Sequence, residues 1–230
     1  MDDDADRYII FAGVNGAGKS TLFNSGAWLQ KPGDAELPRV NPDEILVSHG
    51  WDWSDARAQL RAGKEAVRMV DALFSEHASF NQETTLSGRT IMRRIEQAVG
   101  LGYRVIMHYV GVESPHIACD RIAHRVSTGG HDIDRAIVRQ RYELSMRNLN
   151  RAIRLCDEAY LFDNTNELTL TASFYRGKPV LLSEFPRVAW LHAALDGTGL
   201  LDGPRKKHVK GRQPSSSAAH VQQRNPGSAP

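Results

Sequence analysis

The chain of 230 residues has little cysteine and no long hydrophobic run. Its two cysteines, Cys119 and Cys156, are too few and too widely spaced for a disulfide framework or a thiolate zinc site. No apolar run approaches the ~18 residues of a membrane-spanning helix. Residues 1–6 are acidic, whereas a secretory signal begins basic and continues apolar. We therefore expect a cytoplasmic protein with reduced cysteines and no membrane partner.

The composition is globular, with 41% hydrophobic and 24% charged residues, but the charge is unevenly distributed. Residues 201–230 carry six basic residues and one acidic residue, whereas the rest of the chain carries 23 basic and 26 acidic residues. From Arg205 onward this end has too few large apolar residues to offset the entropy of ordering. We expect one domain over residues 1–200 and a disordered basic tail over residues 201–230. The basic cluster at residues 205–207 could bind nucleic acid, but a solvated tail is the simpler interpretation and no nucleic-acid partner is expected.

Short apolar runs alternate with amphipathic stretches, which is typical of an α/β protein with a parallel sheet. We predict a three-layer P-loop kinase fold, with a mostly parallel five-stranded sheet, helices on both faces and a helical lid. The predicted strands cover residues 7–12, a short segment ending at Val40, 79–83, 103–112 and 158–162. The predicted helices cover residues 19–30, 54–77 with a possible break at Gly63, a segment after residue 89 that runs to Gly102, 115–126 and 132–155. A hairpin over residues 168–182 turns at Gly177.

Residues 13–20, Gly-Val-Asn-Gly-Ala-Gly-Lys-Ser, match the phosphate-loop pattern G-x-x-x-x-G-K-[ST] between a predicted strand and a predicted helix. The glycines let successive backbone N–H groups face inward, and the following helix start adds its positive dipole end. Lys19 would neutralise the β- and γ-phosphates and Ser20 would bind Mg²⁺, so ATP and Mg²⁺ are the expected cofactors. The expected nucleotide-binding residues are Gly13, Asn15, Gly16, Ala17, Gly18, Lys19, Ser20 and Thr21.

A phosphate loop alone does not separate a kinase from a GTPase or a motor ATPase. Residues 163–166, Asp-Asn-Thr-Asn, differ from the Asn-Lys-x-Asp motif with which GTPases read guanine. A motor ATPase would need an acidic residue at the end of an apolar strand to hold Mg²⁺, a glutamate beside it, and usually a longer chain. Small-molecule kinases instead place an acidic residue just past the second strand. Asp43, 24 residues after Lys19, has that position. It could also cap the helix that begins after Asn41, and the two roles are compatible.

Four sequence blocks, within residues 8–164, resemble the zeta-toxin family in their order and composition. They are Asn-Pro-Asp-Glu-Ile at 41–45, Glu-Thr-Thr-Leu-Ser-Gly at 83–88, the segment 102–112, and the segment 125–133 with Gly-Gly-His-Asp-Ile. Zeta toxins are P-loop kinases of toxin–antitoxin systems, and members phosphorylate the sugar 3′-hydroxyl of UDP-N-acetylglucosamine. The resemblance implies ATP-dependent phosphotransfer to a hydroxyl of a small molecule, with this UDP-sugar as the expected acceptor. It also implies a small antitoxin partner that inhibits in trans.

The resemblance implies roles for individual residues. Lys19 and Asp43 would act in catalysis, with Asp43 accepting the proton of the acceptor hydroxyl. The acceptor pocket would be formed by Asp43, Glu83, Thr85 and Arg89. Arginines of a mobile lid would stabilise the transition-state charge. The lid candidates are Arg125, His131 at the position of the family's second arginine, and Arg139 as a substitute.

Alternatives to these roles stay open on the sequence alone. Arg89 could be a solvated surface residue. Glu65 lies near the position of an acidic residue that contacts the substrate in the family, but the segment between Glu65 and Glu83 differs in length from that of the family. A kinase for a nucleoside, nucleotide or antibiotic is one alternative function. A non-catalytic nucleotide-sensing protein that binds nucleic acid is another, although such a sensor needs neither Asp43 nor the lid residues.

Overall fold

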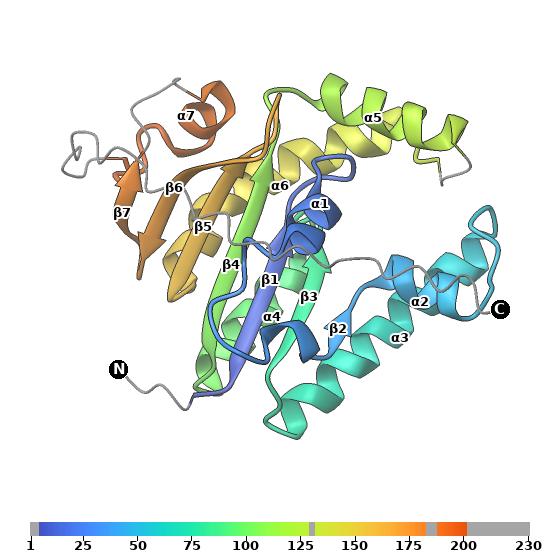
Figure 1. Cartoon of the computed structure of the whole chain (residues 1–230), viewed down its shortest axis with the longest axis horizontal. Coiled ribbons are helices and arrows are strands. Elements are labelled where there is room, and N and C mark those ends of the chain that lie inside the picture. The colour runs from blue at the N-terminus through green and yellow to red at the C-terminus, as the bar shows by residue number, and fades with distance from the viewer. Residues whose placement is uncertain (1–4, 129–131, 183–187, 202–230) are drawn as a thin grey trace, which may run out of the picture.

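The computed structural model describes residues 5–128, 132–182 and 188–201. In this part of the chain the strands form one sheet in the order β2-β3-β1-β4-β5-β6-β7 (Figure 1). The first five strands in this order are parallel, and β6 and β7 are antiparallel to their neighbours. The strands are β1 (Arg7–Ala12), β2 (Arg39–Val40), β3 (Phe80–Thr84), β4 (Arg104–Gly111), β5 (Glu158–Asp163), β6 (Thr169–Tyr175) and β7 (Lys178–Leu182).

The expected α/β fold with a mostly parallel sheet is confirmed, but five strands is too few. The predicted hairpin forms β6 and β7 and extends the same sheet, with Glu158 opposite Tyr175 and Asp163 opposite Thr169. Without β6, the backbone of β5 would present an unpaired edge. Residues 171–174 of β6 are buried, so the hairpin also adds apolar surface to the core. The sheet within the described residues therefore has seven strands.

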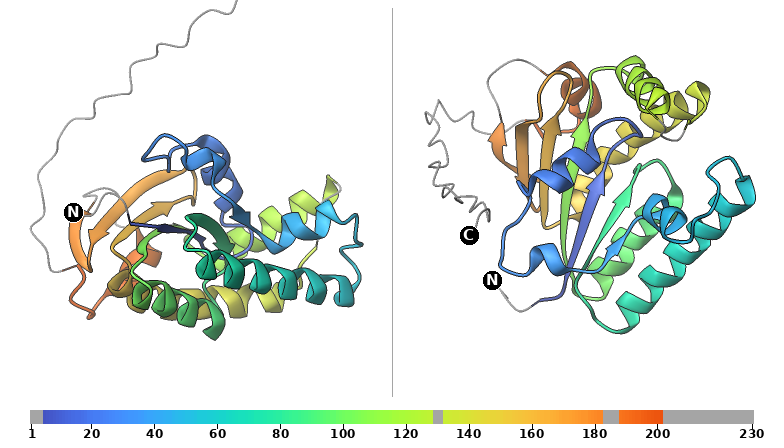
Figure 2. Two further views of the ribbon diagram at one scale, coloured as in Figure 1. Left: turned by 90° about the horizontal axis from the view of Figure 1, so that it is seen from below. Right: turned by 45° about the vertical axis from the view of Figure 1, so that its right-hand side comes forward.

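Helices cover both faces of the sheet. They are α1 (Lys19–Ser25), α2 (Pro42–Ser48), α3 (Ala56–Ser75), α4 (Arg89–Gly100), α5 (Pro115–Ser127), α6 (Arg135–Leu155) and α7 (Ala189–Leu195), with a short 3₁₀ turn at Asp34–Glu36. Side chains alternate along β1, so that Tyr8 and Ile10 pack in one core with α3, α4 and α6. Ile9 and Phe11 pack in a second core with α1 and α5. Figure 2 shows α3, α4 and α6 as one layer on the opposite side of the sheet from α1.

Two helices differ from the sequence prediction, one in its end and one in its continuity. Helix α1 ends at Ser25 instead of continuing to residue 30, because Gly26 adopts a left-handed conformation (φ 67°) and its N–H bonds to Phe23 O. Trp28 then turns back into the core, where its indole N–H donates to Phe23 O. Helix α3 continues without a break through Gly63. A break there is not required, because glycine weakens a helix only modestly.

Helix α7 was not predicted from the sequence. Its Trp190 packs over the end of β4, where a Cβ on Gly111 would lie 2.4 Å from the indole ring. The indole N–H donates to Asp163 Oδ1 at 2.8 Å, which attaches α7 to the end of β5. None of the described helices is long and apolar enough to cross a membrane. The predicted basic tail lies, from residue 202 onward, outside the described residues.

Candidate functional site

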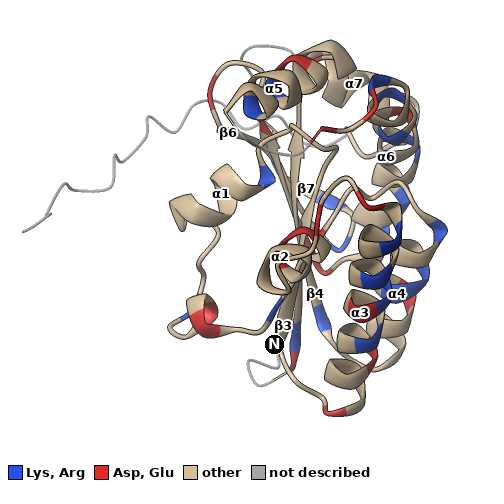
Figure 3. Ribbon diagram, turned by 90° about the vertical axis from the view of Figure 1, so that its right-hand side faces the viewer, with Lys and Arg blue, Asp and Glu red and all other residues tan. Residues whose placement is uncertain are grey.

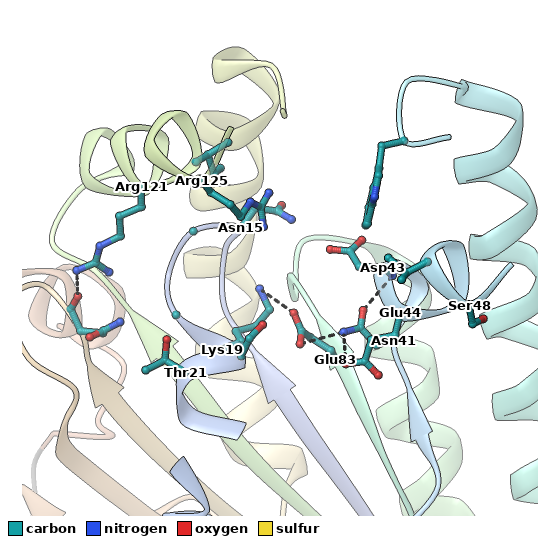
Figure 4. A pocket seen from close by; sticks show the side chains of 17 residues that line it. Asn15, Lys19, Thr21, Asn41, Asp43, Glu44, Ser48, Glu83, Arg121 and Arg125 are labelled. Atoms are coloured by element: carbon teal, nitrogen blue, oxygen red, sulfur yellow. Dashed lines mark hydrogen bonds and ion pairs between the residues drawn. The ribbon is translucent and has the colours of Figure 1, made fainter. Parts of the chain in front are cut away.

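Three adjoining cavities lie beyond the carboxyl ends of β1, β2 and β3, where ligands bind in open parallel sheets. The largest has a volume of about 750 Å³, and the other two measure about 310 and 380 Å³. Asn15 of the phosphate loop and Asp43 of α2 line all three, so the cavities form one continuous cleft. Figure 4 shows this cleft, with the phosphate loop and α1 on one side and α2 on the other.

The phosphate loop (residues 13–20) connects β1 to α1 and requires its glycines. Gly13 has φ 136° and a Cβ there would lie 2.2 Å from Val110 O, and Gly16 has φ 80° and a Cβ there would lie 2.4 Å from Ala118 O. Both the backbone conformation and the close neighbours exclude a larger side chain. The loop can therefore fold tightly around a phosphate group, and its residues fit a nucleoside triphosphate.

Lys19 and Ser20 lie at the start of α1 and line the largest cavity. The Lys19 side chain is only 6% exposed, and its ammonium donates to Val14 O at 3.2 Å. The same Nζ lies 3.6 Å from Glu83 Oε1. Ser20 is exposed in the cleft and its hydroxyl could bind Mg²⁺. Thr21, Asn15, Gly16 and Gly18 also line the largest cavity, whereas Gly13 and Ala17 are the buried members of the loop.

Glu83 at the end of β3 is held in place by a network of polar side chains. Arg39 donates to Glu83 Oε2 at 2.7 Å and to Glu44 Oε1 at 2.7 Å, and Asn41 Nδ2 lies 3.3 Å from Glu83 Oε2. The Arg39 guanidinium stacks on the Phe23 ring, 3.7 Å from its centroid. These contacts fix one carboxylate oxygen of Glu83, and the other faces Lys19 (Figure 4).

Asp43 is the second residue of α2 and lies across the cleft from Asn15 (Figure 4). The helix cap is Asn41, whose Oδ1 accepts from the Asp43 backbone N–H at 3.0 Å. Capping by the Asp43 side chain, the alternative raised by the sequence, is therefore not observed. The Asp43 carboxylate instead belongs to the lining of all three cavities.

Three arginines of α5 and α6 lie beside the phosphate loop. Arg141 donates to Asn15 Oδ1 at 2.8 Å and lines the two smaller cavities, and Arg125 lines the largest. Arg121 donates to the carbonyl oxygens of residues 164 and 165 at 2.7 and 3.1 Å, and it also lines the largest cavity. Asn164 in turn donates to Ala17 O at 2.8 Å. This end of the cleft therefore combines the phosphate loop, α5 and the residues that follow β5.

Tyr142 attaches the part of α6 that carries Arg141. Its hydroxyl donates to Val112 O at 3.0 Å and Glu113 O at 3.1 Å, next to the end of β4. Burial, together with the Glu113 carboxylate, raises the pKa of Tyr142 to about 12. The hydroxyl therefore stays protonated and continues to donate at physiological pH.

The remaining predicted residues have different positions. Thr85 lines the cavity between α3 and α4, and its Oγ1 lies 2.7 Å from Ser87 Oγ. Arg89 is exposed and is absent from the described linings, whereas Arg94 is part of that cavity. Arg139 is exposed on α6 and also lies outside the three linings. His131 lies outside the described residues. Glu65 pairs with His49 at 3.1 Å.

Sequence reasoning missed Arg39, Arg121, Trp53 and Arg141 as lining or positioning residues. A signal for Arg141 was present, because it shares the inward stripe of α6 with Val138 and Ser145, three and four residues away. Arg39 had no such signal, since a two-residue strand shows no periodicity. Trp53 lies in the α2–α3 connection and lines two of the cavities.

Similar solved structures share the fold. A chain of the AvrRxo1-ORF1:AvrRxo1-ORF2 complex with sulphate ions has a TM-score of 0.61 and 17% identity, over 82% of this chain and 65% of that chain. A chain of this complex with ATP has a TM-score of 0.60 and 18% identity, over 92% and 67%. A chain of the PezAT chromosomal toxin–antitoxin system of Streptococcus pneumoniae has a TM-score of 0.52 and 14% identity, over 74% and 72%. At these identities the likeness establishes the fold alone, and the chain spans about two thirds of the length of the first structure.

Sequence comparison gives a closer relationship. No family model matches the chain. An uncharacterised protein of Haemophilus influenzae is 33% identical over 139 residues, which are 59% of this chain and 92% of the relative. The relative is thus matched over nearly its whole length. The chain belongs to the same family as this Haemophilus influenzae protein.

Proposed function

We propose that the protein is an ATP-dependent kinase that transfers the γ-phosphoryl group to a hydroxyl of a small molecule. The observation that carries this proposal is the convergence of Lys19, Asp43 and Glu83 on one cleft at the carboxyl ends of β1, β2 and β3. A protein that only senses nucleotides needs a phosphate loop but has no use for a carboxylate beside it.

The phosphate loop and Lys19 would hold the triphosphate, and Ser20 would bind Mg²⁺. ATP would supply the transferred phosphoryl group, and Mg²⁺ held by Ser20 would supply positive charge that offsets the charge of the phosphates. Glu83 sits between Lys19 and Arg39 and would position Lys19 toward the phosphates. Its anchored carboxylate keeps this arrangement rigid, which phosphoryl transfer needs because alignment is a large part of its catalysis.

Asp43 would orient the acceptor hydroxyl and accept its proton. In this step the acceptor oxygen forms a bond to the γ-phosphorus, and the bond from that phosphorus to the β–γ bridging oxygen breaks. The proton of the hydroxyl passes to Asp43, and ADP leaves. Arg141, which bonds to Asn15, and Arg125, which lines the largest cavity, would stabilise the charge on the transferred group.

The cavity between α3 and α4 would hold the acceptor, with Thr85 and Ser87 in its wall. For its identity we propose the 3′-hydroxyl of the sugar in UDP-N-acetylglucosamine, and for the biological role the toxin of a toxin–antitoxin system. The zeta-toxin-like blocks support both proposals. The structural likeness to a chain of PezAT, a toxin–antitoxin system, supports the second. We further propose that residues 1–200 suffice for catalysis and that residues 201–230 are dispensable.

The test is to incubate the purified chain with Mg-ATP and a panel of UDP-sugars, nucleosides and NAD, and to read the product masses. We expect one acceptor to gain a phosphoryl group and Lys19→Ala to abolish the product, because the triphosphate loses its main side-chain counterion. Phosphorylation of a nucleoside or NAD but of no UDP-sugar would contradict the proposed acceptor and support the proposed kinase activity. Undiminished phosphotransfer by folded Lys19→Ala would remove the kinase proposal.

A further inference from the structure

The helical layer formed by α3, α4 and α6 carries most of the positive charge of the described chain. These helices contain thirteen basic and four acidic residues, whereas the rest of the described residues contain nine basic and eighteen acidic residues. Figure 3 shows the Lys and Arg residues over these three helices, which lie together in one layer. The described part of the chain is electrically neutral as a whole, so its charge is separated between this layer and the remainder.

Eleven of the thirteen basic residues are exposed, and we call the surface that they form the basic helical face; the other two, Arg94 and Arg141, line the cleft. On α3, Arg57, Arg61, Lys64 and Arg68 follow one another at intervals of four, three and four residues, and all four are exposed. The buried stripe of the same helix faces the core. The stripe of charge runs from Arg57 to Arg68 and is ~17 Å long at 1.5 Å per residue.

Acidic residues do not neutralise this face. Three of the four acidic residues in the layer pair with arginines of the layer itself, in the pairs Asp71 with Arg94, Glu96 with Arg151 and Glu143 with Arg147. The fourth, Glu65, pairs with His49. Eight basic residues of the layer make no ion pair within the described part of the chain. Six of them also make no side-chain hydrogen bond there, namely Arg57, Lys64, Arg68, Arg89, Arg93 and Arg139. A face with one dominant sign of charge attracts a partner of the opposite sign, whereas mixed charges serve solubility.

We propose that the basic helical face binds a nucleic-acid duplex through its phosphate backbone. Twelve of the thirteen basic residues are arginines, whose planar guanidinium groups match phosphate oxygens in a bidentate geometry. A stripe of ~17 Å spans about half a turn of a duplex, in which the phosphates recur along both strands.

The chemistry of the face disfavours two other polyanions. Single strands are bound mainly by aromatic side chains that stack on bases, and the aromatic residues of these helices are Phe74, which is buried, and Tyr142, which bonds to backbone carbonyls. An anionic membrane is bound by helices that insert an apolar side, and here the apolar sides of the helices form the core of the domain. Leu60 and Val67 are nevertheless exposed on α3, so the experiment below also measures binding to anionic vesicles.

The experiment measures binding of the full chain to a labelled duplex of about two turns by fluorescence anisotropy, at salt concentrations from about 50 to about 200 mM. We expect a dissociation constant of order 10⁻⁶ to 10⁻⁴ M that rises steeply with salt, because each phosphate contact releases counterions. The variant Arg57→Gln/Lys64→Gln/Arg68→Gln should weaken binding at least ~10-fold and lower the salt slope by about 2 to 3. These side chains are exposed, and unchanged circular dichroism confirms that the variant is folded.

The matched control is Lys206→Gln/Lys207→Gln/Lys210→Gln, which removes the same charge from the basic end of the sequence. It should retain most of the binding. Loss of binding in the control but not in the α3 variant would assign the binding to that end of the sequence and overturn the proposal. Absence of salt-dependent duplex binding would also overturn it, as would an α3 variant that loses binding to phosphatidylserine vesicles but keeps duplex binding. Phosphotransfer is not part of the readout, so failure of this proposal leaves the kinase proposal untouched.

Discussion

At the residue scale, the candidate site depends on side chains whose partners come from distant parts of the sequence. The phosphate loop was predictable because its pattern is local and lies between a strand and a helix. Arg39 was not, because its contacts with Glu83 and Asn81 join β2 to β3 across more than forty residues. Local sequence patterns report propensity and periodicity, and they do not report which side chains meet after folding.

The first prediction concerns Asp43. Asp43→Asn should keep ATP binding but lower kcat at least ~10²-fold, because the amide cannot accept the proton of the acceptor hydroxyl. Nucleotide binding by calorimetry and turnover by product mass separate the two effects. Glu167→Gln, which changes an exposed carboxylate outside the three cavity linings, is the matched control and should change kcat much less. Near-normal turnover in folded Asp43→Asn would leave Asp43 without a role in proton transfer.

His108 leads to a prediction for the pH dependence of stability. Its ring stacks between Phe11 and Tyr160 with centroids 5.6 and 5.2 Å away, and neither ring nitrogen has a hydrogen-bond partner among the described residues. Burial lowers the pKa of His108 from 6.5 to about 4, although the carboxylates of Glu158 and Asp34 oppose this shift. Between these values the unfolded chain binds the proton and the folded chain does not, so stability falls as pH decreases from about 6.5 to about 4.

The loss attributable to His108 should be on the order of a few kcal/mol across this window. Urea unfolding at pH 7 and at pH 4.5 measures it, with His108→Phe as the comparison because that ring cannot titrate. The variant should lose less stability on acidification than the wild type. An equal loss in both proteins would show that other groups cause the acid sensitivity.

At the element scale, the strands and helices up to β5 were largely predictable, while their ends and the C-terminal elements were less so. Buried parallel strands appear as apolar runs, and long helices show a periodic apolar stripe. Helix α1 ended early because Gly26 supplied a left-handed cap, a feature that competes with the apolar residues that follow it. Helix α7 was missed because seven residues are too few for a convincing periodicity.

The contact between β4 and α7 gives the third prediction. Gly111→Ala should destabilise the protein by about 1–3 kcal/mol, because the new methyl group would overlap the Trp190 ring and force a shift in a packed core. Thermal unfolding measures the change. Gly63→Ala is the matched control, since a Cβ in that part of α3 meets no atom within 4 Å, and it should stabilise by about 0.5–1 kcal/mol. Equal stability of Gly111→Ala and wild type would show that α7 packs loosely on the sheet.

At the scale of the whole molecule, the proposed toxin role gives the fourth prediction. A kinase that consumes an essential precursor must be inhibited in its own host, so expression of the chain alone should slow bacterial growth. Lys19→Ala should be harmless at the same expression level, and a neighbouring small gene product should relieve the inhibition by lowering nucleotide binding. Growth curves and nucleotide binding measure both effects. If the wild-type chain is active on its acceptor in vitro but harmless in cells, a housekeeping or detoxifying kinase becomes the better interpretation.

The distribution of tryptophan gives the protein an intrinsic optical signal. Trp28 and Trp190 are buried in the two cores and Trp51 stacks on His49, whereas Trp53 lines two cavities of the cleft. A ligand that enters the cleft should therefore change the polarity around one indole and leave the others nearly unaffected. We expect ATP or an acceptor to shift or quench the emission, and Trp53→Phe to remove most of that change. Titrations of unlabelled protein could then rank candidate acceptors by affinity before any turnover is measured.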